Sequence, residues 1–524
     1  MPPLSLATMA YHCNLGRAFE HIAAIHARRP ALAIGPGQSV SYGELDRCAS
    51  QLANWLKAQG LRRRDVLALF NGKSMEGFAL MLAALKLGAA YVNLDDQNPA
   101  RRLGKILSTC QPRLVVSDHS LPEEILLCCQ TYGKSLLRLP EPAILARHPA
   151  ELPGDHDEAI GSDPAYLMFT SGSTGTPKGV AISHASVLNL VQWAGDEFAI
   201  TPLDVLSNVN PVHFDNSVFD FYAALFNGAA LAPLARDVVA SAADLVRRVD
   251  ELGCTLWFSV PSLLIYLITM RQLRPETWPR IRCLIFGGEA YPKKELKRLF
   301  DLFHPRARLV NVYGPTECTC ICSAYTLTES DFADPRSLAP LGRLAANFDY
   351  LLVSDDLTPA TDGIGELCLL GPQLAIAYYN DPERTARSFV ANPLCAPFHE
   401  RMYRTGDLVR RDEQGLLCFL GRTDNQIKHL GYRIELEEIE AAMHALPQVT
   451  RAVAIYQRVR EQHGQIVAFV SASEPTTAAA IRDSLRNSLP AYMIPGQVEV
   501  LAELPSNANG KVDRLALAQQ LRAR

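Results

Sequence analysis

The segment most able to do chemistry is TSGSTGTPKG, residues 170–179, which follows the apolar run 165–169. Its small residues let backbone N–H groups approach phosphate oxygens, while hydroxyls and a lysine donate further hydrogen bonds to negative charge. It is not a Walker loop, because Pro177 stands where that motif has glycine and Gly179 follows the lysine. A Ser/Gly linker would not normally follow a strand and end in Pro-Lys-Gly, so the segment predicts a phosphate-binding loop. The residues expected at the phosphate are Thr170, Ser171, Gly172, Ser173, Thr174, Gly175 and Lys178.

Four more charged side chains stand in short motifs beside turn residues. They are Asp215 in HFDNS (213–217), Glu317 in YGPTE (313–317), Asp407 in YRTGD (403–407) and Lys511 in NGKVDR (509–514). A carboxylate can accept hydrogen bonds from hydroxyls or pair with a cation, and a lysine can neutralise phosphate. Taken singly, each motif is also compatible with a simple turn or a solvated surface.

The sequence between about Leu15 and Leu370 predicts a framework that positions these residues. Strands are expected at 65–70, 91–94, 113–117, 255–260 and 282–288, and a helix at 75–88. Such alternation indicates mostly parallel sheets covered by helices. The expected fold class is therefore α/β, with a large N-terminal domain of stacked, mostly parallel sheets.

The pattern changes after Gly365. Shorter strands near turns, at 366–371 and 415–422, are typical of a small β subdomain. From Asp424 onward, helices at 435–446 and near 477–489 with strands at 451–459 and 465–472 predict a small α+β domain. The expected division is 1–423 for the large domain and 424–524 for a small, mobile C-terminal domain.

Composition excludes several classes of protein. The 524 residues are 48% hydrophobic and 20% charged, which is enough for two or more domains and too apolar for disorder. With 51 basic and 55 acidic residues the net charge is −4, so no nucleic-acid partner is expected. No export leader or membrane-spanning stretch is recognisable, and a cytoplasmic monomer is expected.

The cysteines could indicate a metal site. All 13 fit reduced thiols in a cytosolic enzyme, but Cys318, Cys320 and Cys322 resemble a run of metal ligands. Period-two spacing is also what a strand with one apolar face gives, and no second pair has a matching zinc spacing. A strand is expected there, without a metal.

The phosphate-loop segment resembles that of the adenylate-forming superfamily, which includes adenylation domains of non-ribosomal peptide synthetases, acyl-CoA synthetases and firefly luciferase. Further motifs similar to the family's follow in family order at 41–45, 86–95, 214–222, 311–317, 365–371, 403–410, 421–440 and 509–514. The resemblance thus covers nearly the whole chain. It implies a stand-alone amino-acid-activating ligase that uses ATP and Mg²⁺.

In this family the substrate carboxylate attacks the α-phosphorus of ATP and pyrophosphate leaves. The resemblance implies three catalytic residues: Glu317 holds Mg²⁺, Thr316 contacts phosphate, and Lys511 bridges the carboxylate and the α-phosphate in the transition state. It also implies that the Asp407 carboxylate accepts hydrogen bonds from the two ribose hydroxyls of the nucleotide. The other nucleotide contacts that it implies are Gly288, Glu289, Asn311, Tyr313, Gly314, Phe419 and Arg422.

The resemblance also implies that the small domain rotates about Asp424 after adenylation and brings Gly431 close to a tunnel for the thiol. This chain has KHLGYR where KIRGxR is commoner, which leaves the contacts of His429 and Leu430 open. Asn93 replaces the usual proline, and the sequence gives no functional reason for it.

Asp215 favours an α-amino acid as substrate, because in amino-acid-activating relatives this carboxylate pairs with the substrate ammonium. The pocket wall implied by the resemblance is Asn216, Phe219, Phe258, Ile285, Gly287, Val312, Cys320 and Ile321. This mostly apolar wall predicts a medium aliphatic side chain, such as that of isoleucine or valine. One methylene is worth only about 1–3 kcal/mol, so the sequence does not choose among close homologues.

The expected acceptor is the phosphopantetheine thiol of a separate carrier protein, since the chain ends soon after Lys511. Three alternatives remain. An acyl-CoA synthetase or aryl-acid ligase is disfavoured by Asp215, and a catalytically inactive binding module is disfavoured by the intact motifs. A kinase-like phosphotransferase would release ADP in place of AMP and pyrophosphate.

Overall fold

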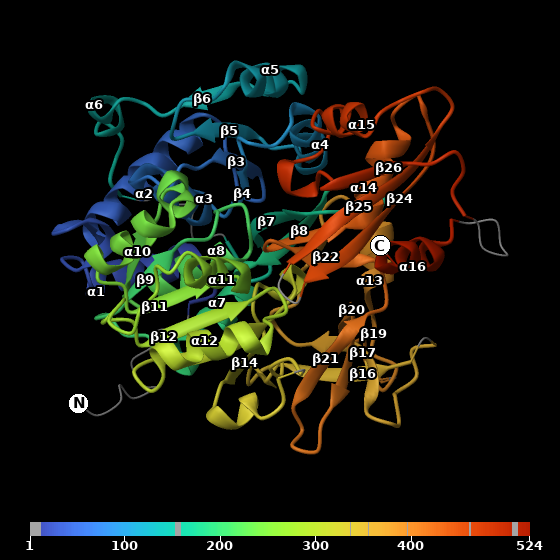
Figure 1. Cartoon of the computed structure of the whole chain (residues 1–524). Helices are drawn as coiled ribbons and strands as arrows, with labels where there is room; N and C mark the ends of the chain where they lie inside the picture. Colours follow the sequence, from blue (N-terminus) through green and yellow to red (C-terminus); the bar gives the residue numbers. More distant parts are fainter. Residues whose placement is uncertain are drawn as a thin grey trace.

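The computed structural model describes residues 12–151, 159–335, 337–354, 356–395, 397–460, 463–505 and 512–523. Two large sheets form the body of the N-terminal part (Figure 1). In spatial order, the nine-stranded sheet contains β15 (Arg343–Leu344), β14 (Ser323–Thr326), β13 (Arg308–Tyr313), β12 (Cys283–Gly287), β11 (Leu256–Ser259), β9 (Val205–Asn208), β10 (Ala230–Pro233), β1 (Pro30–Gly35) and β2 (Gln38–Ser41). The seven-stranded sheet contains β18 (Ala377–Tyr378), β8 (Lys178–Ser183), β7 (Pro164–Thr170), β4 (Ala90–Leu94), β3 (Val66–Phe70), β5 (Leu114–Ser117) and β6 (Leu136–Arg138).

The central strands of both sheets are parallel, as predicted, and the antiparallel pairs lie toward the sheet ends. β12 is buried at every position, because its two faces enter different cores. Ile285 faces the core between the sheets, whereas Leu284 and Phe286 face the outer core. The predicted α/β class is confirmed.

Helices fill the space between the two large sheets and cover their outer faces. Between the sheets lie α1 (Leu15–Ile25), α2 (Tyr42–Ala58), α3 (Met75–Lys86), α7 (His184–Glu197) and the π-helical turn η3 (Phe219–Ala223). Outside lie α10 (Ala242–Glu251), α11 (Pro261–Thr269) and α12 (Lys293–Phe303) on the nine-stranded sheet, and α4 (Ala100–Cys110) and α5 (Glu123–Thr131) on the other. Shorter segments are α6 (Pro142–Leu145), α8 (Asn216–Val218), α9 (Arg236–Ala240), α13 (Pro382–Ser388), η4 (Thr316–Cys318) and η5 (Glu329–Phe332).

Local sequence explains where these helices begin and which face they bury. α2 starts after Ser41, whose side chain accepts from the backbone of Glu44 while the Glu44 carboxylate accepts in return. α4 buries Leu103, Ile106 and Leu107 at helical spacing. Its Arg102 is also buried, and this arginine faces the C-terminal domain.

A small β subdomain follows, as predicted. Its sheet contains β16 (Asp349–Val353), β17 (Ile364–Leu370), β20 (Arg401–Arg411), β19 (Phe389–Ala391) and β21 (Leu417–Arg422).

The small C-terminal α+β domain lies above the β subdomain in Figure 1. Its strands are β22 (Gln426–His429), β23 (Tyr432–Glu435), β24 (Val449–Arg460), β25 (His463–Ala472) and β26 (Gln497–Val500). Its helical segments are α14 (Leu436–His444), α15 (Ala478–Leu485), η6 (Ala491–Met493) and α16 (Arg514–Ala523). One face of the β24–β26 sheet shares a core with α14 and α15, and the other face shares a core with α16.

Two expectations about local structure are wrong. The cysteine run is not a strand: Cys318 ends η4, Thr319 and Cys320 have positive φ, and β14 starts only after Cys322. All three thiols are nevertheless buried, because the turn folds inward. The helix expected near 477–489 ends at Leu485, before the turn that leads to Pro490.

Within the described ranges, the helices are all too short or too polar to cross a membrane.

Candidate active site

An open cavity lies where the N-terminal body, the β subdomain and the β22–β23 hairpin meet. The carboxyl ends of the parallel strands β11, β12 and β13 meet at this edge, which is where α/β sheets bind ligands. The predicted site residues that line the cavity are Thr170, Ser171, Asp215, Asn216, Phe258, Gly288, Val312, Tyr313, Gly314, Thr316, Cys320, Ile321, Asp407 and Arg422. The structure thus brings together motifs that are far apart in sequence.

Asp407 lines the cavity and accepts hydrogen bonds from two donors. The Tyr313 hydroxyl donates to Oδ2 at 2.6 Å, and Nη1 of Arg422 donates to Oδ1 at 2.5 Å. Arg422 also donates from Nε and Nη2 to both oxygens of Asp424, each at 2.6 Å. Burial opposes ionisation of Asp424, but the hydrogen bonds from Arg422 keep its pKa below the usual value. The expected hinge residue is thus tied to the expected ribose-binding carboxylate.

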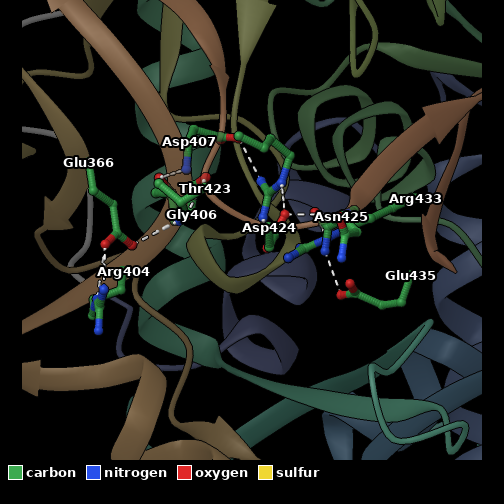
Figure 2. Close-up of polar contacts among 12 residues, drawn as sticks. Glu366, Arg404, Gly406, Asp407, Thr423, Asp424, Asn425, Arg433 and Glu435 are labelled. Atoms are coloured by element: carbon green, nitrogen blue, oxygen red, sulfur yellow. Dashed lines mark hydrogen bonds and ion pairs between the residues drawn. The ribbon is translucent and has the colours of Figure 1, made fainter. Parts of the chain in front are cut away.

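Figure 2 shows how the turn before Asp407 is supported. Glu366 accepts from the backbone N of Gly406 at 3.0 Å and from Nη2 of Arg404 at 2.6 Å. Gly406 has φ +72°, and a Cβ there would lie 2.6 Å from Nη2 of Arg422. Glycine is favoured at this position, because a side chain would be strained by the backbone conformation and would crowd the nearby guanidinium.

The phosphate-loop segment contacts the C-terminal domain. Ser171 Oγ donates to the Arg433 carbonyl at 2.7 Å and accepts from the Glu435 N–H at 3.1 Å. The Gly172 N–H donates to Oε2 of Glu438 at 3.2 Å, while the other Glu438 oxygen accepts from Arg102. The Glu438 carboxylate of α14 therefore accepts from a backbone N–H that was predicted to bind phosphate.

The far half of this loop lines a second cavity between α4 and α14. Thr174 and Gly175 belong to its wall, and Lys105 donates to the Gly175 carbonyl at 2.5 Å. Ser173 lies on the surface. The seven residues predicted to contact phosphate therefore do not all line the same cavity.

Glu317 is fully buried beside the main cavity and does not line it. Its Oε2 accepts from Arg433 Nη1 at 2.6 Å, and its Oε1 accepts from the Tyr378 hydroxyl at 2.7 Å, with Lys178 Nζ 3.2 Å away. Burial disfavours the charged form, yet Arg433 and Lys178 hold the pKa of Glu317 far below its usual value.

This arrangement does not fit Mg²⁺ at Glu317, because both carboxylate oxygens already have donors and two cations stand beside them. Binding of Mg²⁺ there requires Arg433 to move away. We therefore derive no step through the metal.

Asp215 also lines the cavity. Its Oδ2 accepts from the Thr316 hydroxyl at 2.5 Å, and burial raises the pKa of Asp215 although Thr316, Arg433 and Lys428 lower it. Asn93 donates to the Val212 carbonyl at 3.1 Å, in the loop that leads to Asp215. This bond gives the unexplained Asn93 a positioning role that a proline could not supply.

The predicted side-chain pocket is only partly on the cavity wall. Phe258, Val312 and Ile321 give it an apolar surface together with Cys320 and Asn216. Three predicted members lie behind that wall and do not line the cavity: Phe219, Ile285 and Gly287. Phe219 packs edge-on against Phe258 with ring centroids 5.2 Å apart, so it supports the wall.

Other predicted nucleotide contacts lie away from the cavity wall. Glu289 accepts from the Gly431 N–H at 2.5 Å and from the Ser262 N–H at 3.1 Å, so it fixes the hairpin. Asn311 donates to the Pro340 carbonyl at 2.8 Å, and Phe419 packs against the main core. Lys511 lies outside the described residues.

No contacts were predicted from the sequence for several residues of the hairpin and of η6. Lys428 and Arg433 line the cavity beside Gly431, and so does Tyr492 of η6, whose ring stacks on that of Tyr432 with centroids 3.6 Å apart. The signal for Lys428 and Arg433 was the charge pattern inside 421–440, and no signal pointed to Tyr492. His429 turns away to Tyr456 at 3.2 Å, and Leu430 is exposed, which answers the question about these two departures.

Comparison with known proteins gives consistent matches. The family profile described as AMP-binding enzyme matches residues 19–379, and that described as AMP-binding enzyme C-terminal domain matches 438–511. Tyrocidine synthase 1 of Brevibacillus parabrevis is 33% identical over 98% of this chain and 46% of its own length. D-alanine–D-alanyl carrier protein ligase of Bacillus anthracis is 31% identical over 92% of this chain and 95% of its own.

Among solved structures, a holo NRPS protein containing adenylation and PCP domains has a TM-score of 0.82. It is 28% identical and covers 97% of this chain and 84% of its own. The chain spans less than half the length of the peptide synthases it matches.

Proposed function

Since the chain belongs to the AMP-binding enzyme family, whose members are AMP-forming adenylating ligases, we propose that it activates an α-amino acid with ATP and passes the aminoacyl group to a carrier-protein thiol. The observation that carries the proposal is that two carboxylates, Asp407 and Asp215, line one cavity. Asp407 suits two ribose hydroxyls, and Asp215 suits an α-ammonium. An aminoacyl-adenylate carries both groups, the ribose hydroxyls on one side of the phosphate and the ammonium on the other.

The first step joins the amino-acid carboxylate to the α-phosphorus and releases pyrophosphate. In this proposal Lys511 neutralises the negative charge that develops in the transition state, as the family resemblance implies. Asp215 and Asp407 orient the substrates. Phe258, Val312 and Ile321 favour a medium aliphatic side chain and exclude a charged one, since they offer it no partner.

The second step transfers the acyl group from phosphate to sulfur. The described arrangement suits this step, because the hairpin carrying Lys428 and Gly431 closes one wall of the cavity. The segments on both sides of 506–511 pack on the outer face of the C-terminal sheet, through Leu504 and Val512. We also propose that the C-terminal domain rotates about Asp424 between the two steps.

The experiment that tests the function is amino-acid-dependent exchange of labelled pyrophosphate into ATP, run over the proteinogenic amino acids and aliphatic analogues. Strong exchange with one aliphatic amino acid supports the proposal and identifies the substrate. Exchange only with aryl or fatty acids would mean that the protein is an acyl-CoA synthetase or aryl-acid ligase. Exchange with none of these acids would contradict an adenylating activity.

The pH dependence of amino-acid binding gives an independent prediction. Only ionised Asp215 pairs with the substrate ammonium, and its pKa without substrate is raised by burial. We expect KM for the amino acid to rise as the pH is lowered from neutral into the acid range, and the rise should begin at a higher pH than an ordinary aspartate would produce. The measurement is KM in pyrophosphate exchange across this range, with a des-amino acid analogue as the control that should show no such rise.

A further inference from the structure

An arginine outside the predicted site reaches the phosphate-loop segment. Arg384 belongs to α13, and its Nη2 donates to Oγ1 of Thr174 at 3.0 Å. Its Nη1 lies on the side of Gly172 where a Cβ would stand, 3.5 Å from that position. The guanidinium therefore extends along the first turn of the loop, from Gly172 to Thr174.

The fold explains why Arg384 lies beside this loop. Strand β18, just before α13, pairs with β8, the strand that continues from the loop. α13 then begins after Asp381, whose Oδ1 accepts from the Arg384 backbone N–H at 3.0 Å. The Tyr378 ring of β18 lies near two cations, with its centre 5.9 Å from the Arg384 guanidinium carbon and 5.1 Å from Lys178 Nζ. Both cations therefore stand at the base of the loop.

The two cations differ in what holds them. Lys178 is buried between two carboxylates, 3.2 Å from Glu317 and 3.8 Å from Glu435. Arg384 pairs at 3.3 Å with Asp381, whose side chain is 34% exposed, and such an ion pair open to water is weak. A guanidinium has five N–H donors, and within the described residues these contacts use only part of that capacity. Arg384 can therefore bind another anion at the loop without breaking a buried ion pair.

We propose that Arg384 binds the β- and γ-phosphates of ATP and holds pyrophosphate as it leaves. This inference rests on the proposed function, in which the segment 170–179 binds the phosphates of ATP. It gives a role to a residue that no motif of the sequence singled out, and this role belongs to the first step alone. A guanidinium suits the ligand, because its planar fork matches two phosphate oxygens at once.

The charge balance of adenylation explains what a cation does at this point. An oxygen of the amino-acid carboxylate forms a bond to the α-phosphorus, and the bond from that phosphorus to the oxygen shared with the β-phosphate breaks. Its electron pair stays on pyrophosphate, whose negative charge increases as it leaves, and a fixed cation stabilises this charge. The ligand of Arg384 is thus present in ATP and in pyrophosphate but absent from AMP and from the aminoacyl-adenylate.

The test compares ligands with and without these phosphates in Arg384→Gln and Arg384→Lys. We expect Arg384→Gln to raise the Kd for ATP, and the KM for pyrophosphate in the exchange reaction, by about 10- to 100-fold, the range for hydrogen bonds to charged groups. The Kd for AMP and the rate of transfer from supplied aminoacyl-AMP to pantetheine should not change, because neither involves pyrophosphate. Arg384→Lys should recover part of the ATP affinity, since it keeps the charge but loses the planar fork.

Arg387→Gln is the matched control, because it removes the same charge from the same helix. Arg387 is 80% exposed and pairs with Glu383 at 3.5 Å, so its replacement should change none of the four quantities. Unchanged binding of ATP and pyrophosphate in Arg384→Gln overturns the role of Arg384. So does an equal weakening of AMP, or the same loss in Arg387→Gln. Absence of exchange in the unaltered chain contradicts the proposed function itself, whereas the ratio of the Kd values for ATP and AMP needs no turnover.

Discussion

Replacing Asp215 by asparagine is expected to lower kcat/KM for the amino acid in pyrophosphate exchange by about 100- to 1,000-fold. Asparagine keeps the shape of the side chain and its contact with Thr316, but it cannot neutralise an α-ammonium. Removing one partner of a desolvated, hydrogen-bonded charge pair costs about 3–5 kcal/mol, and the lower part of this range corresponds to the expected loss. The effect should fall mainly on KM, because the pair forms in the ground state as well as in the transition state.

The control for Asp215→Asn is the matching acid without an amino group. The variant should use this des-amino analogue at least as well as the unaltered chain does, because its pocket no longer contains an unpaired carboxylate. An equal fall in kcat/KM for both acids would mean that Asp215 supports the fold of the loop and does not recognise the ammonium group. An unchanged KM for the amino acid would contradict its assignment altogether.

Lys511→Ala is expected to remove most adenylation, by about 1,000-fold in the rate of pyrophosphate exchange, while ATP still binds. A cation that bridges the attacking carboxylate and the α-phosphate acts chiefly in the transition state, so its loss reduces kcat and spares binding. Exchange kinetics and equilibrium binding of ATP, measured on the same preparation, check the two halves of this expectation.

Measuring the two half-reactions separately makes the Lys511 prediction specific. Lys511→Ala should lose the first half-reaction, yet transfer from chemically supplied aminoacyl-AMP should persist. Unchanged exchange in Lys511→Ala would contradict the assignment, and so would loss of ATP binding of similar size.

Regular elements of the fold were predictable where one physical signal dominated. β12 and α3 lie within one or two residues of their expected ranges, because a short apolar run and a long helical one leave few alternatives. The cysteine run misled the prediction, because inward burial of a turn produced the same spacing as a strand face. α15 was predicted too long, since Ser488 and Leu489 continue the helical pattern past its real end.

The candidate site was predictable as a set of motifs but not as a set of contacts. Asp407, Asp215 and Tyr313 were found because each belongs to a local motif. The pairing of Arg433 with Glu317 and of Arg102 with Glu438 joins residues 116 and 336 positions apart, which local patterns cannot report. These pairs depend on how the C-terminal domain sits on the body, and that placement decides which residues line the cavity.

The hydrogen bond from Gly172 to Glu438 links domain position to nucleotide affinity. If the loop binds phosphate as proposed, one N–H cannot serve a phosphate and this carboxylate at once. Binding of ATP at this N–H and docking of α14 on it then oppose each other, and linkage requires each to weaken the other by the same factor. A saturating ATP concentration therefore favours release of α14 from the loop, and a cross-link that holds α14 in place should raise the Kd for ATP.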